Sequence, residues 1–323
     1  MKRITLHDID PAAFTHPADQ STLATIRAIP GAERLVTWSV DSEESTVPHK
    51  SLGSVRPLSP TQREYDLYID VLHTLDAAAQ WPIFVKDTSV PNAVAVGGAK
   101  PHIMITRGLL DTGDEHLIRF AMGHEVGHLM ADHGAYRFMM SRLMLVGWAG
   151  YIINPLVGGA AILGLKAALT AWIRTSEYTA DRAGLLALQD VKAAAHCLNQ
   201  LRTGTDDTLF HVMGGLFSTH PERTARMSAL DEWAHSGAYE RILAGTYARR
   251  SFAHTRAVSR EDFAAYQVGV RELSTSAYDV HDAPADRADW QKSAERELSE
   301  LDLDDDDDSV DLDALISDEL DDL

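Results

Sequence analysis

His124-Glu125-Val126-Gly127-His128 is the stretch from which the rest of this chain can be interpreted. It reads HExxH, a pattern in which two histidines bind a catalytic zinc and the glutamate acts as a base. Residues four apart lie on one face of an α-helix, so both histidines are expected to bind one ion. Glu125 lies about 100° around the helix, where it can take a proton from water that the metal activates.

The surroundings of this motif indicate a helix with a buried side. The chain has 15 histidines, so an accidental match has to be weighed against the context. Over residues 115–133, apolar side chains recur at helical spacing, and Asp111 or Asp114 is placed to cap the start. Gly123 and Gly127 lie inside this helix, where each costs about 1 kcal/mol relative to alanine. That cost predicts close packing of another element against the helix.

A catalytic zinc needs a third protein ligand and keeps one position open. The best downstream candidate is Glu177, in a stretch with helical character that continues to Leu188. Asp181 is four residues further on and therefore on the same face, where it can orient a zinc-binding imidazole. The alternative is an ordinary pair of surface carboxylates, with Asp181 next to Arg182.

Four segments in a fixed order carry a family resemblance. They are Pro91–Gly98 followed by Ile103–Leu110, the HExxH motif followed by His133, Glu177 to Asp181 as ExxxD, and Ser218-Thr219-His220-Pro221 followed by Arg226. In this order they resemble the HtpX-like and CAAX-prenyl-endopeptidase-like zinc metallopeptidases. In that family the first segment is an edge strand lining the substrate cleft, followed by the strand that leads into the active-site helix. The matches span about half of the chain, residues 81–235.

The resemblance implies a role for each matched residue. His124, His128 and Glu177 would bind one Zn²⁺ per chain, and Glu125 would be the general base. His220 would lie near the open zinc position, where it stabilises the oxyanion or acts as a replaceable fourth ligand; a histidine that caps a turn is the alternative. The remaining implied residues are Asp181 behind a zinc ligand, Arg226 supporting that region, and Asn92 and Ala93 offering backbone groups to an extended peptide.

The order of predicted elements indicates an α+β fold, mostly helical, with a small sheet and a zincin-like peptidase domain. Helices are expected near Ser21–Ile29, Thr61–Ala79, Val191–Leu201 and Glu222–Ala234, with Arg241–Arg250 extending the helical part and a last helix at Glu261–Leu273. Trp81–Val85 is expected to be a strand. We divide the chain into an N-terminal extension (1–60), the metallopeptidase domain (61–275) and an acidic tail (276–323).

Residues 143–173 are almost uncharged, with Lys166 as the exception. Asn154-Pro155 and Gly158-Gly159 are expected to break this run, which leaves two halves too short to be confident membrane spans. A hydrophobic hairpin is therefore expected, either in a soluble protein, where it is buried or packed on a partner, or dipped into a membrane. Membrane-integral relatives have spans in this same interval, so the position leaves both interpretations open.

Charge and cysteine content limit the remaining choices. The net charge of −19 is concentrated in residues 297–323, which hold 14 acidic and no basic residues; the rest of the chain has 34 acidic and 29 basic residues. This segment is expected to be disordered and either to dock on a protein partner or to regulate the enzyme, with simple solvation as the alternative. It argues against nucleic acid as a ligand. Cys197 is the single cysteine, and the first residues lack a signal peptide, so a cytoplasmic location is expected, with membrane association through 143–173 as the alternative.

The sequence therefore predicts a zinc metalloendopeptidase that acts on proteins or peptides. The competing interpretation is a protein that binds zinc without proteolysis and works as an adaptor or chaperone through its hydrophobic hairpin and acidic tail. Glu125 counts against that interpretation, because a purely structural zinc site does not need a base. A helical scaffold in which HExxH is accidental would not explain the four ordered segments.

Overall fold

The computed structural model describes residues 3–28, 55–77, 79–97, 101–134, 157–201 and 223–250. Its helices are η1 (Pro11–Ala13), α1 (Pro17–Ala28), α3 (Arg63–Thr74), α4 (Arg107–Asp111), α5 (Glu115–Met130), α7 (Val157–Leu188), α8 (Val191–Gln200), α10 (Arg223–His235) and α11 (Ala238–Leu243). Its strands are β1 (Val55–Pro57), β2 (Ile83–Lys86), β3 (Ala93–Val96) and β4 (His102–Thr106). The described residues are thus mostly helical with a small four-stranded sheet, as predicted.

The sheet has the strand order β1-β2-β4-β3. β2 and β4 run parallel, and β3 pairs antiparallel with β4, with Ala95 opposite Ile103. Among the described strands β3 therefore lies at one end of the sheet. The stretch Ile103–Leu110 is only partly strand, because Thr106 ends β4 and its side chain caps the short helix α4.

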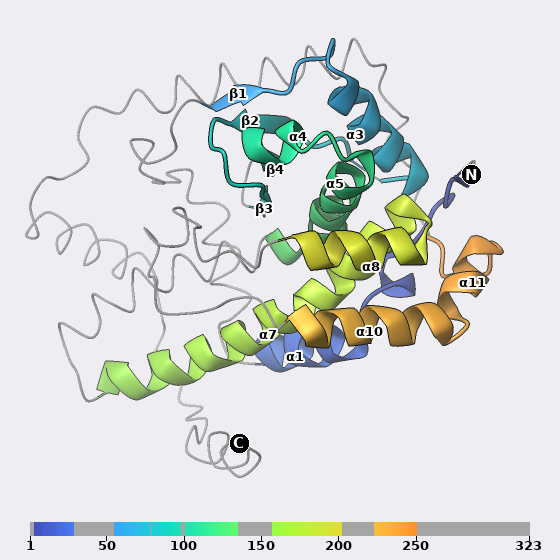
Figure 1. Cartoon of the computed structure of the whole chain (residues 1–323). Coiled ribbons are helices and arrows are strands. Elements are labelled where there is room, and N and C mark those ends of the chain that lie inside the picture. The colour runs from blue at the N-terminus through green and yellow to red at the C-terminus, as the bar shows by residue number, and fades with distance from the viewer. Residues whose placement is uncertain are drawn as a thin grey trace, which may run out of the picture.

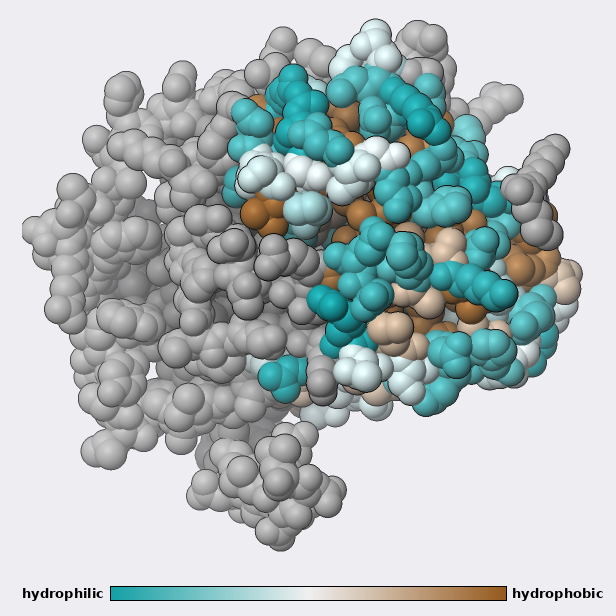
Figure 2. All heavy atoms as spheres, viewed as in Figure 1, coloured by the Kyte–Doolittle hydropathy of each residue, from teal (hydrophilic) through white to brown (hydrophobic). Residues whose placement is uncertain are grey.

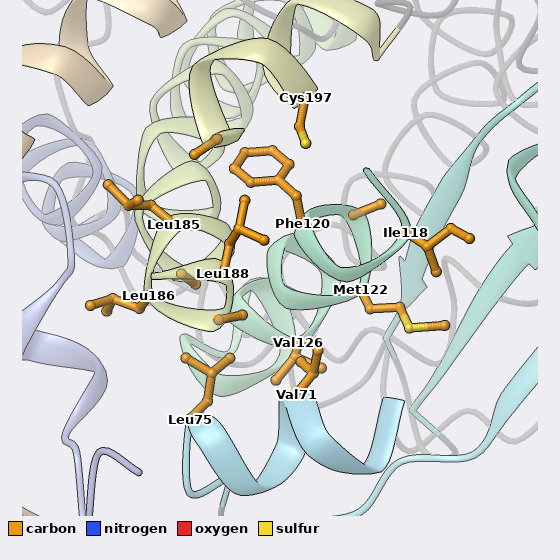
Figure 3. Packing of buried hydrophobic residues seen from close by; sticks show 14 of the residues in the cluster. Val71, Leu75, Ile118, Phe120, Met122, Val126, Leu185, Leu186, Leu188 and Cys197 are labelled. Carbon is orange, nitrogen blue, oxygen red and sulfur yellow. The ribbon is translucent and has the colours of Figure 1, made fainter. Parts of the chain in front are cut away.

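Helix α5 lies between the sheet and helix α7, and α1 and α10 pack on α7 (Figure 1). Asp114, one of the two predicted caps, accepts hydrogen bonds from the backbone N–H groups of His116 and Leu117 and so begins α5. The interior between α3, α5 and α7 is filled by aliphatic and aromatic side chains (Figure 3). Val71 comes from α3, Val126 from α5 and Leu186 from α7, and all three are fully buried.

The predicted close approach to Gly123 and Gly127 is made by α7. A methyl group at Gly123 would lie 2.4 Å from Cβ of Ala187, and one at Gly127 would lie 2.4 Å from Cβ of Ala183. Both distances are far shorter than carbon atoms in contact allow. The glycines of the HExxH helix are therefore required by a helix–helix contact that leaves no space for a side chain.

Helix α7 differs from the predicted hairpin. It runs without interruption from Val157 to Leu188, so the break expected at Gly158-Gly159 is wrong. Both glycines lie at the start of this helix as described, and the residues before Val157 are outside the described part of the chain. The second half of the apolar run and the stretch that carries Glu177 form one helix. The first half of that run, including Asn154-Pro155, lies outside the described residues.

The N-terminal segment packs on the rest of the described chain. The N–H of Leu6 donates to the carbonyl of Thr74, and Ile9 forms an isolated antiparallel bridge with Arg249. Helix α1 begins at Pro17 and not at Ser21, because proline is favoured in the first turn of a helix.

The other helix ends also shift from their predicted positions. α3 ends at Thr74 and not at Ala79, and Asp76 just beyond it has a positive φ of 44°. α11 ends at Leu243, and Gly245 has a φ of 82°, so the helix predicted over Arg241–Arg250 does not continue. The helix predicted at Glu261–Leu273 lies outside the described residues.

The surface of the described residues is largely polar on the face seen in Figure 2, where hydrophobic residues appear as small separate areas. Within the part of the chain that the structure describes, Ile4 is the exposed large hydrophobic residue. No helix among these residues has both the length and the apolar character needed to cross a membrane.

We expect Gly127→Ala to destabilise the protein, because the added methyl group forces α5 and α7 apart. Overpacking of this kind costs about 1–3 kcal/mol, which exceeds the gain of up to about 1 kcal/mol in helix propensity. Urea denaturation of the metal-free protein measures the effect. The double variant Gly127→Ala/Ala183→Gly removes the methyl group that the new side chain would strike, and it should recover most of the lost free energy of unfolding. A double variant no more stable than Gly127→Ala would contradict this account.

Candidate metal centre

Three buried side chains converge between α5 and α7. His124 and His128 come from α5 and Glu177 from α7, and their ligand atoms all lie within 4.8 Å of one another. The two Nε2 atoms are 3.1 Å apart. Glu177 places one carboxylate oxygen 3.5 Å from Nε2 of His124 and the other 3.3 Å from Nε2 of His128.

These separations fit a zinc ion. Nitrogen and oxygen ligands lie about 2.0–2.2 Å from zinc, and two ligands in tetrahedral positions are then about 3.3–3.5 Å apart. The two Nε2 atoms are 3.1 Å apart, and they lie 3.5 and 3.3 Å from different oxygens of Glu177, so these distances are close to that range. Two imidazoles and one carboxylate also form a ligand set used by catalytic zinc sites, which keep the fourth position for water or substrate.

The electrostatics of this cluster favour a cation. Burial would lower the pKa of His124, but hydrogen bonds to Asp181 and Glu177 and the nearby carboxylates outweigh it and raise the pKa to about 9. The surroundings thus stabilise positive charge at the imidazole. A divalent ion between the three side chains would provide that charge in place of a proton.

Asp181 and Arg226 lie behind the cluster. Asp181 Oδ1 is 3.1 Å from Nδ1 of His124, and Arg226 donates to both Asp181 oxygens at 2.6 and 2.9 Å. Arg226 also forms an ion pair with Glu177 at 3.2 Å. Burial by itself would raise the pKa of Asp181, but Arg226 and His124 hold it below its ordinary value. Asp181 therefore stays ionised and can hold the His124 ring with Nε2 facing the cluster.

Glu125 is held by the sheet. The backbone N–H of Ala95 on β3 donates to a carboxylate oxygen of Glu125 at 2.6 Å. This hydrogen bond links the HExxH helix to the strand at the end of the sheet. It also fixes the carboxylate, which is almost fully buried, beside the histidine cluster.

Asn92, Ala93 and His220 are the residues that were predicted to contact the substrate. The N–H of Asn92 donates to Thr106 Oγ1, and its carbonyl accepts from the N–H of Thr106, so its backbone groups face β4. The N–H of Ala93 donates to the side-chain oxygen of Asn92. His220 lies outside the described residues. The roles of Asn92, Ala93 and His220 toward a substrate stay predictions.

Sequence reasoning missed a second polar group beside the cluster. His133 Nδ1 lies 2.9 Å from Nδ1 of His128, and His133 Nε2 lies 3.0 Å from Oδ2 of Asp19. His133 follows the HExxH motif by five residues, so the sequence indicated that it could lie near His128. Asp19 gave none, because a carboxylate in the first turn of a helix is usually explained by the helix dipole.

Comparison with known proteins agrees with this arrangement. The model of peptidase family M48 matches residues 71–234, about half of the chain. A plastoglobule-localised metallopeptidase 48 from the chloroplast of Arabidopsis thaliana is 26% identical over 267 residues, which cover 73% of this chain and 76% of the plant protein. An HtpX protease homologue of Bifidobacterium longum is 25% identical over 248 residues, covering 62% of this chain and 81% of its own.

A further HtpX protease homologue, from Kineococcus radiotolerans, is 27% identical over 210 residues, which cover 50% of this chain and 71% of the bacterial protein. Comparison with solved structures gives no significant match. These findings confirm the resemblance drawn from the four ordered segments. They support a peptidase, a hydrolase that acts on proteins or peptides.

We expect Arg226→Met to lower the free energy of unfolding by about 3–5 kcal/mol in the metal-free protein, because it leaves two buried carboxylates without their cation. Arg174→Met is the matched control, since Arg174 is an exposed arginine on the helix that carries Glu177. Urea denaturation of both variants at neutral pH measures the difference. Equal stability of the two variants would contradict the role of Arg226.

The destabilisation by Arg226→Met should depend on pH. The folded-state pKa of Asp181 lies below its ordinary value of 3.8, so its pairing with Arg226 stabilises the protein above that pH. This contribution is lost as the pH falls through the folded-state pKa. The difference in stability between wild type and Arg226→Met should therefore shrink below about pH 4, as followed by urea denaturation from pH 7 to about pH 2. A difference that grows in acid would contradict the assignment.

Proposed function

We propose that this chain, which belongs to peptidase family M48, is a zinc-dependent metalloendopeptidase. The observation that carries the proposal is the convergence of His124, His128 and Glu177, whose mutual distances fit zinc. In this proposal the three side chains hold one Zn²⁺ per chain. When bound, zinc supplies Lewis acidity, which polarises a peptide carbonyl and makes water a better nucleophile at neutral pH.

Glu125 acts as the general base in this proposal. Glu125 follows His124 directly in the sequence. Its carboxylate points toward β3, where the N–H of Ala95 donates to it. From there it takes a proton from the attacking water and later passes that proton to the leaving nitrogen. Fixing the carboxylate in advance favours proton transfer, because the base does not have to be oriented during the reaction.

The peptide substrate binds along β3 in this proposal. Asn92 faces β4 through its backbone, and residues alternate in direction along a strand, so the carbonyls of Ala93 and Ala95 face the opposite edge, where their N–H groups donate to Asn92 Oδ1 and Glu125. Small side chains on that edge allow an extended peptide to approach closely. The link from Ala95 to Glu125 places this edge beside the base.

His220 and Arg226 complete the proposal. His220 would stabilise the oxyanion that forms at the peptide carbonyl, or would act as a replaceable ligand of the metal. Arg226 supports this region from α10 through its bonds to Asp181 and Glu177. Asp181 orients His124.

The domain division stays part of the proposal: an extension at 1–60, the peptidase domain at 61–275 with the hydrophobic segment 143–173, and an acidic tail at 276–323. The tail is proposed to bind a protein partner or to regulate the enzyme. A cytoplasmic location, with membrane contact through 143–173 as the alternative, stays a prediction.

The proposal predicts about one zinc per chain and cleavage of casein by the wild-type protein. Glu125→Gln keeps the shape of the side chain but removes the base, so it should retain zinc and lose cleavage by a factor of at least about 100. Elemental mass spectrometry and a casein cleavage assay on both proteins measure the two results.

Two other outcomes would change the conclusion. Zinc bound in both proteins with cleavage in neither would favour the adaptor or chaperone alternative, or an enzyme held inactive, which removal of residues 297–323 would reveal. No zinc in the wild-type protein after reconstitution would reject the metal centre and the proposed mechanism.

A further inference from the structure

A buried series of hydrogen bonds begins at Nδ1 of His128, the ring nitrogen that does not face Glu177. Nδ1 of His128 meets Nδ1 of His133 at 2.9 Å, and Nε2 of His133 meets Oδ2 of Asp19 at 3.0 Å. His133 and Asp19 are each 1% exposed. Asp19 lies on α1, far outside the matched residues 71–234.

The number of protons on the two rings decides which nitrogen donates and which accepts in each of these hydrogen bonds. A neutral imidazole has one N–H donor and one nitrogen acceptor. If His128 binds zinc through Nε2, its proton must be on Nδ1, so His128 donates and His133 Nδ1 accepts. His133 then has its own proton on Nε2 and donates to Asp19. The opposite direction would place a proton on His128 Nε2, where it would block zinc.

Asp19 can only accept in this arrangement. The indole N–H of Trp172 donates to Asp19 Oδ1 at 2.9 Å, and the hydroxyl of Thr179 donates to Oδ2 at 2.5 Å. An indole nitrogen has no acceptor, so this bond has a single direction. Burial would raise the pKa of Asp19, but the hydrogen bonds from His133, Thr179 and Trp172 hold it below its ordinary value. Asp19 is therefore an ionised acceptor.

We propose that Asp19 and His133 are positioning residues that fix His128 in the tautomer with Nε2 free for zinc. The inference rests on the zinc site of the proposed function. It assigns a part of the metal centre to the N-terminal segment, where the sequence indicated only an extension. Carboxylates behind zinc-binding histidines raise the basicity of the ligand and hold its ring. Here the carboxylate acts through a second imidazole.

A purely structural role for Asp19 is the competing explanation, because α1 packs on α7. Other bonds contribute to that packing without involving His133. Thr22 and Thr175 share a hydrogen bond at 2.9 Å, and the N–H of His16 donates to Thr179. Thr22→Val removes one of these anchoring bonds. The Thr22 hydroxyl contacts Asp19 only at its backbone carbonyl, so the variant leaves the Asp19 carboxylate and its partners in place and is a matched control for the attachment of α1.

Asp19→Asn is the first test. The amide has one oxygen, so it cannot accept from both Trp172 and His133. If its oxygen faces Trp172, its NH₂ group faces His133 and favours the tautomers that block zinc. If its oxygen faces His133, its NH₂ group opposes the Trp172 N–H. We expect zinc affinity of the full chain to fall by about 10-fold to 100-fold, and that of Thr22→Val to stay close to the wild-type value.

His133 provides a second pair of variants in case Asp19→Asn does not fold. Glutamine has both an acceptor for His128 and a donor for Asp19, whereas phenylalanine has neither. We expect His133→Gln to retain most of the zinc affinity and His133→Phe to lose about 10-fold to 100-fold. Competition with a chromophoric chelator measures zinc affinity, and thermal denaturation of the metal-free proteins monitors folding.

The outcomes separate this inference from the proposed function. Wild-type affinity in Asp19→Asn or His133→Phe, with one zinc per chain, would overturn the inference and leave the metal centre standing. Equal loss in Asp19→Asn and Thr22→Val would assign Asp19 to anchoring and also overturn it. If the wild-type chain takes up no zinc, the proposed function fails and the inference fails with it.

Discussion

The contact between α5 and α7 is the constraint on which the metal centre depends. Gly123 and Gly127 bring the backbone of the HExxH helix against Ala187 and Ala183, closer than any side chain would allow. Glu177 lies six residues before Ala183 on the same helix, so this distance of approach sets how near its carboxylate comes to the two histidines. The helix propensity lost at the two glycines is therefore a cost of this close helix contact.

A second constraint is the balance of buried charge. Glu125, Glu177, Asp181 and Asp19 are all nearly inaccessible to water, and buried carboxylates are costly unless they are paired. Arg226 pairs with two of them, Asp181 and Glu177. Burial would lower the pKa of His124, but its hydrogen bonds to Asp181 and Glu177 and the charges of Glu177 and Glu125 raise it, which favours a cation at the converging ligand atoms. The same residues that shape the site thereby make it electrostatically suited to a divalent metal.

Local periodicity explains which parts of this site could be predicted. His124 and His128, like Glu177 and Asp181, are four residues apart, so a helix places each pair on one face whatever the tertiary structure. The two glycines also signalled a close neighbour, though not which helix it is. The continuity of α7 through Gly158-Gly159 was missed because glycine pairs usually mark turns. The contribution of Asp19 depends on tertiary packing, and no local pattern records it.

The N-terminal segment is better understood through what it contacts than through its place in the sequence. Arg182, one residue after Asp181, donates to the carbonyls of Phe14 and Thr15 and lies over the ring of Trp233 on α10. One helix, α7, thus carries the proposed ligand Glu177, Asp181 beside Nδ1 of His124, and Arg182, which attaches the N-terminal segment. That segment in turn places Asp19 behind His133. Both histidines of the HExxH motif are then backed by a carboxylate, His124 directly and His128 through another imidazole, and each carboxylate comes from a different part of the chain.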